Sequence, residues 1–115
     1  MTLEIVKSEY VWKEYGDDVI IAALSIFPVG ESTSLSSYVR ASLDELKQTG
    51  LTIQPGSMAT TIEASTLDDL FQAVKKAHDI QIAMGAQRVY FVLTVDDRQD
   101  KNATMSTKLR AIGAD

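Results

Sequence analysis

The spacing of apolar residues predicts an α+β fold in which a strand, a helix, two strands, a helix and a strand follow one another. Apolar residues alternate or run together in four short segments and recur every three to four residues in two longer ones. Glycine or proline separates most of these segments. This order is that of a ferredoxin-like βαββαβ sandwich, a four-stranded antiparallel sheet with two helices on one face.

Residues 18–27 form the first predicted strand, and both of its faces are apolar. A strand of this kind belongs in the middle of a sheet that is covered on both sides. Pro28 cannot donate a hydrogen bond to a neighbouring strand, so we expect the strand to end at Phe27. One face carries Ile20, Ala22, Leu24 and Ile26, and the other carries Ile21, Ala23, Ser25 and Phe27.

The first helix is predicted from Leu35 to Leu46, with Ser34 or Thr33 as its N-cap and Gly50 at the C′ position. Residues 51–54 then alternate between apolar and polar and read as a short strand. The proline that follows this strand places it at an edge of the sheet.

A hairpin returns into residues 58–64, which are rich in β-branched side chains. Thr66 is a good N-cap for the second helix, which ends before Gly85. Residues 88–95 form the last strand, and residues 104–112 a short C-terminal helix. In this topology the first and third strands are central.

The composition is that of one globular domain of 115 residues with a formal net charge of -5 and no cysteine. The acidic balance and the scattered lysines and arginines argue against a nucleic-acid partner. No segment has the pattern of a signal peptide or is apolar enough to span a bilayer, so we expect a cytoplasmic protein without a membrane partner. Residues 1–16 fit no single period and are expected to form an arm or an extra strand beside a domain of residues 17–115.

The sheet face without helices is unusual because Glu63 is its only predicted charge. A solvated face would alternate with many charged side chains, so we expect a second subunit to cover most of this face. Glu63 then either pairs with a cation of the partner or lies in a partly closed ligand pocket. Ser25 and Thr61, with an aromatic side chain nearby, would suit a small nitrogen heterocycle that carries a positive charge.

The remaining candidates are weaker. His78 is the only histidine, and without cysteine or a second histidine it reads as a partly buried helix residue rather than a metal ligand. Asp96, Asp97 and Asp100 alternate with basic residues and do not match a calcium loop. We therefore predict no metal site, no cofactor and no catalytic residue.

Five segments in one collinear run resemble the thiamine-binding proteins of the YkoF-like, ferredoxin-fold group. They are V-I-I-A-A-L-S-I-F-P-V-G, S-T-S-L-S-S-Y-V, G-S-M-A-T-T-I-E-A, A-V-K-K-A-H and R-V-Y-F-V-L-T-V-D-D-R-Q-D-K, within residues 19–112. The resemblance implies a non-enzymatic cytoplasmic protein that binds thiamine or its hydroxymethylpyrimidine moiety. It also implies self-association as a dimer or a dimer of dimers.

The resemblance places ligand contacts at Thr60, Thr61 and Glu63, and at Ser34. Alternation directs Thr60 toward the helices unless a bulge intervenes. Glu63 would accept hydrogen bonds from the aminopyrimidine or balance the thiazolium charge, Thr61 and Ser25 would orient the ring, and Tyr90 or Phe27 would stack on it. Two alternatives stay open: a dimeric enzyme acting on a small aromatic or lactone substrate with Glu63 as base and His78 as its partner, and a regulatory module that senses a metabolite.

Overall fold

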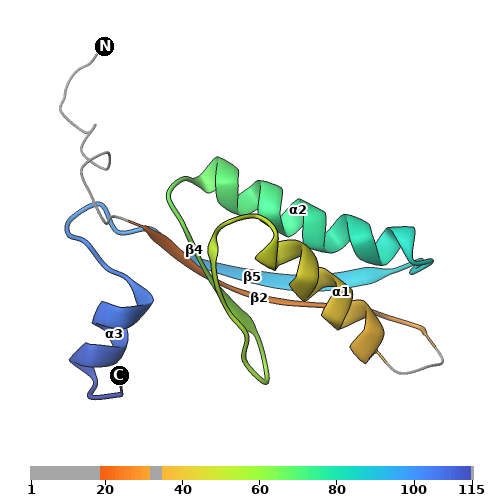
Figure 1. Cartoon of the computed structure of the whole chain (residues 1–115), viewed down its shortest axis with the longest axis horizontal. Coiled ribbons are helices and arrows are strands. Elements are labelled where there is room, and N and C mark those ends of the chain that lie inside the picture. Colours follow the sequence, from red (N-terminus) through yellow and green to blue (C-terminus); the bar gives the residue numbers. More distant parts are fainter. Residues whose placement is uncertain (1–18, 32–34, 115) are drawn as a thin grey trace, which may run out of the picture.

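The structure is a computed structural model and describes residues 19–31 and 35–114. The arm expected over residues 1–16 and the candidate Ser34 lie outside the described residues. Figure 1 shows the described elements, which are β2 (Ile20–Pro28), α1 (Ser36–Lys47), β3 (Thr52–Gln54), β4 (Thr60–Ala64), α2 (Leu67–Ala83), β5 (Val89–Asp96) and α3 (Met105–Ala111).

The four strands form one antiparallel sheet in the order β3-β4-β2-β5. The first and third strands of the domain, β2 and β4, are therefore central, as predicted. Helices α1 and α2 lie side by side on one face of this sheet, and α3 lies on the other side at one end (Figure 1). The ferredoxin-like α+β fold and the C-terminal helix are both confirmed.

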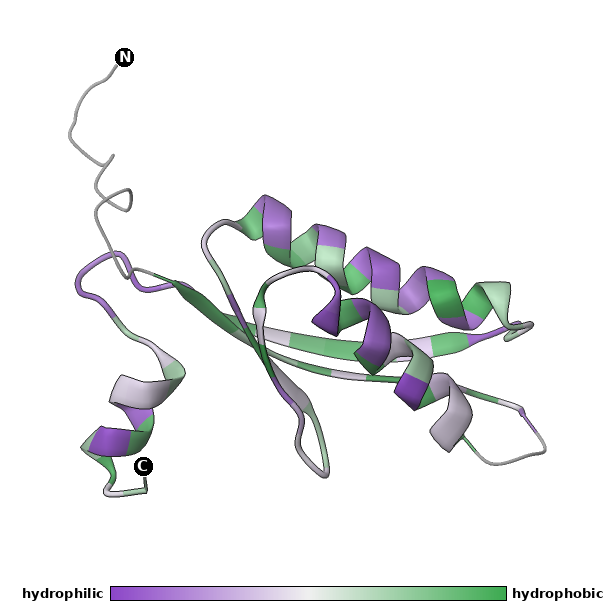
Figure 2. Ribbon diagram, in the orientation of Figure 1, coloured by the Kyte–Doolittle hydropathy of each residue, from purple (hydrophilic) through white to green (hydrophobic). Residues whose placement is uncertain are grey.

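The strand register confirms which residues share each face. Ile21 lies opposite Glu63 and Ala23 opposite Thr61, which puts these four residues on the face without α1 and α2, the helix-free face. The other face packs under the two helices. Figure 2 shows the sheet largely in the colour of apolar residues. The core is formed by Ile20, Ala22, Leu24, Ile26, Leu46, Ile62, Ala64, Leu70, Ala73, Val74 and Ala77.

Helix α1 begins differently from the prediction. Its N-cap is Leu35, whose backbone is already α-helical and whose side chain makes no capping hydrogen bond, so the assignment of Ser34 or Thr33 as N-cap is wrong. The carbonyl of Leu35 instead accepts hydrogen bonds from the main-chain N–H groups of Tyr38 and Val39. At the other end Gln48 is the C-cap, and Gly50, with φ of 83°, follows one position later than expected.

Helix α2 begins as predicted, with the Thr66 side chain accepting a 3.0 Å hydrogen bond from Asp69 N. Strand β4 begins at Thr60 rather than at residue 58, because residues 55–59 form the loop of the hairpin. Strand β5 extends to Asp96, which lies opposite Ile21. The helix-free face therefore carries a second carboxylate in addition to Glu63.

Pro28 belongs to β2 and lies opposite Val89, so the prediction that this proline ends the strand before it is wrong. The main-chain N–H of Val29 donates to Arg88 O at 2.8 Å, on the β5 side. Because successive residues of a strand direct their main-chain groups to opposite sides, the nitrogen of Pro28 points away from β5. Among the described strands none lies on that side to need a donor, which explains why proline is tolerated.

Candidate functional site

Strand β2 extends beyond the end of its pairing with the neighbouring strand β4. Its pairing with β4 covers Ile20 to Leu24, whereas its pairing with β5 continues to Pro28. Within the part of the chain that the structure describes, residues 25–28 of β2 consequently have a strand on one side only, and we call the other side the open edge. By the alternation that applies to Val29, the main-chain N–H and C=O of Ile26 point toward this open edge.

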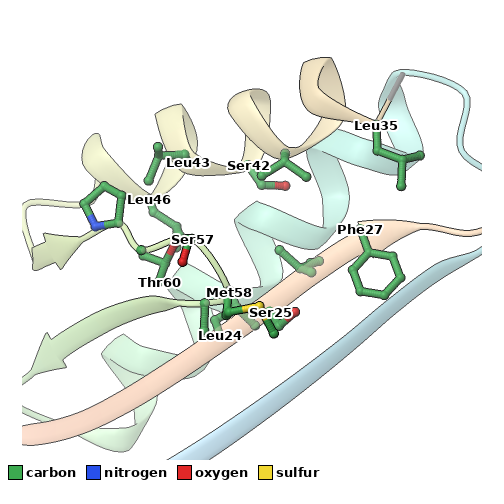
Figure 3. Close-up of a pocket in the computed structure, with 15 residues that line it drawn as sticks. Leu24, Ser25, Phe27, Leu35, Ser42, Leu43, Leu46, Ser57, Met58 and Thr60 are labelled. Atoms are coloured by element: carbon green, nitrogen blue, oxygen red, sulfur yellow. The ribbon is translucent and has the colours of Figure 1, made fainter. Parts of the chain in front are cut away.

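A cavity of about 320 Å³, the edge cavity, lies at the open edge between β2, α1 and the β3–β4 loop. Leu24 and Ile26 belong to one face of β2 and Ser25 and Phe27 to the other, so the cavity extends around the edge of the strand. Figure 3 shows it with Phe27 and Leu35 near one end. The further lining residues are Val39, Ser42, Leu43, Leu46, Pro55, Gly56, Ser57, Met58, Ala59 and Thr60.

The edge cavity is apolar with a few hydroxyl groups, and none of its described lining residues is charged. The hydroxyl groups of Ser25, Ser57 and Thr60 are each able to donate and to accept a hydrogen bond, whereas the proton of the Ser42 hydroxyl is donated to Ala77 O. Such a site favours a neutral, flat ligand with both donors and acceptors. It offers no counter-charge to a phosphate or a carboxylate.

Ser42 fixes the helix wall of the edge cavity. Its Oγ donates to Ala77 O at 2.6 Å and accepts from Gln81 Nε2 at 2.9 Å, which ties α1 to α2. Both side chains are buried, and Gln81 Oε1 has no hydrogen-bond partner among the described residues. Buried hydrogen bonds of this kind hold the helix wall of the cavity in a fixed position. The opposite wall, the loop of residues 55–59, is exposed at most positions.

The structure brings three of the predicted ligand residues together at the edge cavity: Ser25, Phe27 and Thr60. Thr60 lies opposite Leu24 and so faces the helices, as strand alternation predicts without any bulge. Thr60 lines the edge cavity because the cavity extends between the sheet and α1, on the face to which Thr60 points. Tyr90 does not line the cavity, but its ring lies 5.6 Å from that of Phe27, measured between ring centroids, and is half-exposed.

Thr61 lies at a different place, beside a second cavity of about 460 Å³ between the helix-free face and α3, the face cavity. Glu63 Oε2 accepts a 2.5 Å hydrogen bond from Met105 N, in the first turn of α3. Lys108 of the same helix donates to Asp96 Oδ2 at 2.6 Å. The described chain thus uses both carboxylates of this face to hold its own C-terminal helix.

His78 and Glu63 are not brought together. The ring of His78 meets that of Phe91 edge-on on the helix side of β5, with 6.3 Å between centroids, whereas Glu63 is on the helix-free face. The sheet separates the two groups. The acid–base pair that the enzyme alternative requires is therefore not assembled in this chain.

Ser57 and Met58 belong to the segment that the resemblance indicates as the binding region, residues 57–63, but neither they nor the main chain of Ile26 were singled out as ligand contacts. The signal was present in the hairpin: residues 55–59, P-G-S-M-A, contain a proline and a glycine, and shortening the predicted strand by two residues would have revealed the open edge. Among residues 19–31 and 35–114, no three histidine, aspartate or glutamate side chains gather as metal ligands. No described helix is long and apolar enough to cross a membrane.

Comparison with known proteins agrees with this architecture. The chain is 40% identical over 95 residues to a UPF0045 protein of Methanothermobacter thermautotrophicus, covering 82% of this chain and 96% of that protein. The crystal structure of a hypothetical protein from Methanocaldococcus jannaschii matches with a TM-score of 0.77 and 34% identity, over 84% of this chain and 97% of the other.

A putative thiamine biosynthesis/salvage protein of Thermotoga maritima shares the fold, with a TM-score of 0.71 at 17% identity over 82% of this chain and 98% of that chain. The sequence model of a family described as thiamine-binding protein matches residues 22–113. That range runs from β2 through α3 and contains every lining residue of the edge cavity and all but Ile21 of the face cavity. The chain therefore belongs to the thiamine-binding protein family.

Proposed function

We propose that this protein binds thiamine or its hydroxymethylpyrimidine moiety without chemically changing it, as a cytoplasmic homo-oligomer that carries or senses the ligand. The observation that carries the proposal is the uncharged, hydroxyl-lined edge cavity at the open edge of β2. Its volume is at the lower end of the range for small-molecule sites, as expected for a single heteroaromatic ring. Family membership supports the same ligand class.

The aminopyrimidine ring is neutral and flat and offers an amino donor beside a ring-nitrogen acceptor. The main chain of Ile26 offers the complementary acceptor and donor at the open edge, as a strand would offer them to another strand. Thr60, Ser57 and Ser25 supply hydroxyl groups around that position, and Phe27, supported by Tyr90, supplies an aromatic surface. Ser34 directly precedes the lining residue Leu35 in the sequence and stays a candidate.

The face cavity is the second candidate location, because it lies beside a carboxylate. Glu63 would balance the thiazolium charge and Thr61 would orient the ring. The two cavities are lined by different residues of the same strands: Leu24 and Thr60 line the edge cavity, and their neighbours Ala23 and Thr61, on the other face of the sheet, line the face cavity. One small ring cannot occupy both places in a single chain, so variants of each cavity separate them.

Isothermal titration calorimetry with thiamine and with hydroxymethylpyrimidine tests the proposal. Thr60→Val removes one hydroxyl at nearly constant shape and is expected to weaken binding about threefold to tenfold, whereas Thr60→Ser retains the hydroxyl as the control. Weaker binding in Glu63→Gln with unchanged binding in Thr60→Val would move the site to the face cavity. No heat and no thermal stabilisation by either ligand at millimolar concentration would contradict the function.

Carriage and sensing differ in the response of the assembly. A sensor changes its oligomeric state when thiamine binds, and a passive carrier does not. Sedimentation velocity with and without thiamine distinguishes the two roles.

A further inference from the structure

The open edge of β2 presents its main-chain groups in a fixed order. Even-numbered residues of β2 direct these groups away from β5, so Ile26 presents an N–H followed by a C=O, and Pro28 presents a C=O without a donor. Leu24, the preceding even-numbered residue, is already paired with Thr60 of β4. Along the direction of the strand, residues 25–28 therefore present a donor, an acceptor and a second acceptor.

This order gives a bound aminopyrimidine ring a direction. A 4-aminopyrimidine has one edge on which an acceptor, the ring nitrogen N3, lies beside a donor, the 4-amino group. N3 accepts from the N–H of Ile26 while the amino group donates to its C=O, whereas in a reversed ring the amino group would face the N–H. The 2-substituent, which is next to N3, then points back toward Leu24. The 5-substituent, which is next to the amino-bearing carbon, points on toward Phe27.

The two ends of the edge cavity differ in how closed they are. Figure 3 shows Leu46 and Thr60 toward one end and Phe27 and Leu35 toward the other. We call the first the closed end, because Leu24 and Leu46 are 2% and 1% exposed and β4 begins there at Thr60. We call the second the outer end, where Leu35 is 38% exposed. The closed end lies two residues, about 7 Å of strand, before the position of the ring, which leaves little room for a 2-substituent.

A carboxylate lies near the outer end. Glu31 follows β2 in the chain, and its Oε1 accepts a 3.1 Å hydrogen bond from the Tyr38 hydroxyl. Tyr38 is in the first turn of α1, between the lining residues Leu35 and Val39. The negative charge is therefore held beside the helix wall of the outer end. A cationic 5-substituent such as the thiazolium would be attracted to it there, whereas no described lining residue of the cavity itself is charged.

We propose that the edge cavity binds 4-aminopyrimidines in one direction only, with a 2-substituent no larger than methyl at the closed end and the 5-substituent leaving through the outer end. The inference rests on the proposed function and adds to it the ligand class, defined by its substituents. Thr60 then limits the size of the 2-substituent. Leu35 lies beside the path of the 5-substituent, and Glu31 favours a positive charge on it.

Two ligands that differ only in the 2-substituent test the closed end. By isothermal titration calorimetry, the 2-propyl homologue of hydroxymethylpyrimidine is expected to have a dissociation constant at least about tenfold higher than that of the natural 2-methyl compound. Thr60→Ala enlarges this end and should reduce the ratio of the two constants to below about threefold, whatever it does to each constant. Ser25→Ala, on the other face of β2, also loses a hydroxyl and is the matched control, for which the ratio should stay unchanged.

Two variants test the outer end with thiamine, which has a large cationic 5-substituent, and hydroxymethylpyrimidine, which has a small neutral one. Leu35→Trp obstructs the outer end and should raise the dissociation constant of thiamine about fivefold or more, and that of hydroxymethylpyrimidine less than about twofold. Glu31→Gln should weaken thiamine binding about twofold to fivefold and leave hydroxymethylpyrimidine binding unchanged. Glu45→Gln, later in α1, is the charge-matched control. Far-UV circular dichroism confirms that each variant is folded.

The outcomes separate the direction of the ring from the function itself. Equal affinity of the wild type for the 2-methyl and 2-propyl compounds would overturn the direction and leave the proposed function intact. Equal losses of thiamine and hydroxymethylpyrimidine binding in Leu35→Trp would do the same. A wild-type chain that binds neither thiamine nor hydroxymethylpyrimidine would overturn both the inference and the proposed function.

Discussion

Strands β2 and β5 lie side by side in one sheet, are both rich in branched and aromatic residues, and are buried to very different degrees. Ile20, Ala22 and Leu24 of β2 are each 2% exposed, whereas Tyr90 and Val92 of β5 are about half-exposed. The difference comes from their neighbours: β2 pairs with β4 over Ile20–Leu24 and with β5 over Ile21–Pro28, whereas among the described residues β5 pairs with β2 alone. An apolar strand sequence therefore predicts burial without saying whether the same chain supplies it.

The largest difference in unfolding free energy is expected between a truncated side chain in β2 and a truncated side chain in β5. Leu24→Ala leaves a cavity in the core and should lower the free energy of unfolding by about 2–5 kcal/mol. Val92→Ala should change it by less than about 0.5 kcal/mol in the single chain, since much of that side chain already contacts water. Urea unfolding at protein concentrations where the chain is monomeric measures both. Similar costs would mean that the contrast between the strands is wrong.

A smaller loss of unfolding free energy is expected in the two helices, α1 and α2, that cover β2. Ser42→Ala removes the hydroxyl that joins Ala77 O to Gln81 Nε2 and leaves both groups buried without this partner. The expected loss is about 1–3 kcal/mol of unfolding free energy. Ser37→Ala, at an exposed position of the same helix, is the control and should cost little. A neutral Ser42→Ala would show that packing alone holds α1 against α2.

A still smaller effect concerns the end of β2 that α3 covers. Glu63→Gln removes the negative charge that accepts the hydrogen bond from Met105 N at the start of α3. The expected cost is about 0.3–1 kcal/mol, seen as faster amide exchange across residues 105–111. Glu45→Gln on α1 is the matched control. Unchanged exchange in α3 would mean that Lys108 with Asp96, and the Thr104 cap, hold this helix without Glu63.

The smallest effect is a pH dependence on the flank of α2 beside β5. The hydrogen bond from Lys75 and then that from His78 lower the pKa of Asp79. A carboxylate with a lowered folded-state pKa contributes stability that is present above its unfolded pKa, about 3.9, and is lost as the pH falls through the folded value. Asp79→Asn should therefore flatten the melting temperature against pH below about pH 4. An identical profile in wild type and variant would contradict this assignment.

Much of the fold was predictable because alternation and helical spacing encode which residues face the core. The alternation at residues such as Ile20 and Ile21 predicts the two faces of β2, and the N-cap at Thr66 predicts where α2 begins. The order of the elements in turn predicts which two strands are central. The ends of elements were less accessible, since Leu35, Pro28 and Asp96 take positions that depend on contacts made elsewhere in the chain.

The candidate site was predictable only in part. Ser25, Phe27 and Thr60 do meet at one cavity, but sequence reasoning placed the ligand on the helix-free face with Thr61 and Glu63. Side-chain alternation assigns each residue to one face of a sheet and assumes that the sheet is continuous. It cannot place a cavity that arises where a neighbouring strand stops and both faces become accessible together.

The unequal lengths of β2 and β4 also have a consequence for how this site could vary. The volume of the edge cavity depends on the position of the β3–β4 turn rather than on any one side chain. Two more residues in register at the start of β4 would bring main chain alongside Ser25 and Ile26 and fill the space without altering a single hydroxyl. Relatives with a longer hairpin would then keep the fold and the hydroxyl groups around the edge cavity, yet lack the space that we propose for a ligand ring.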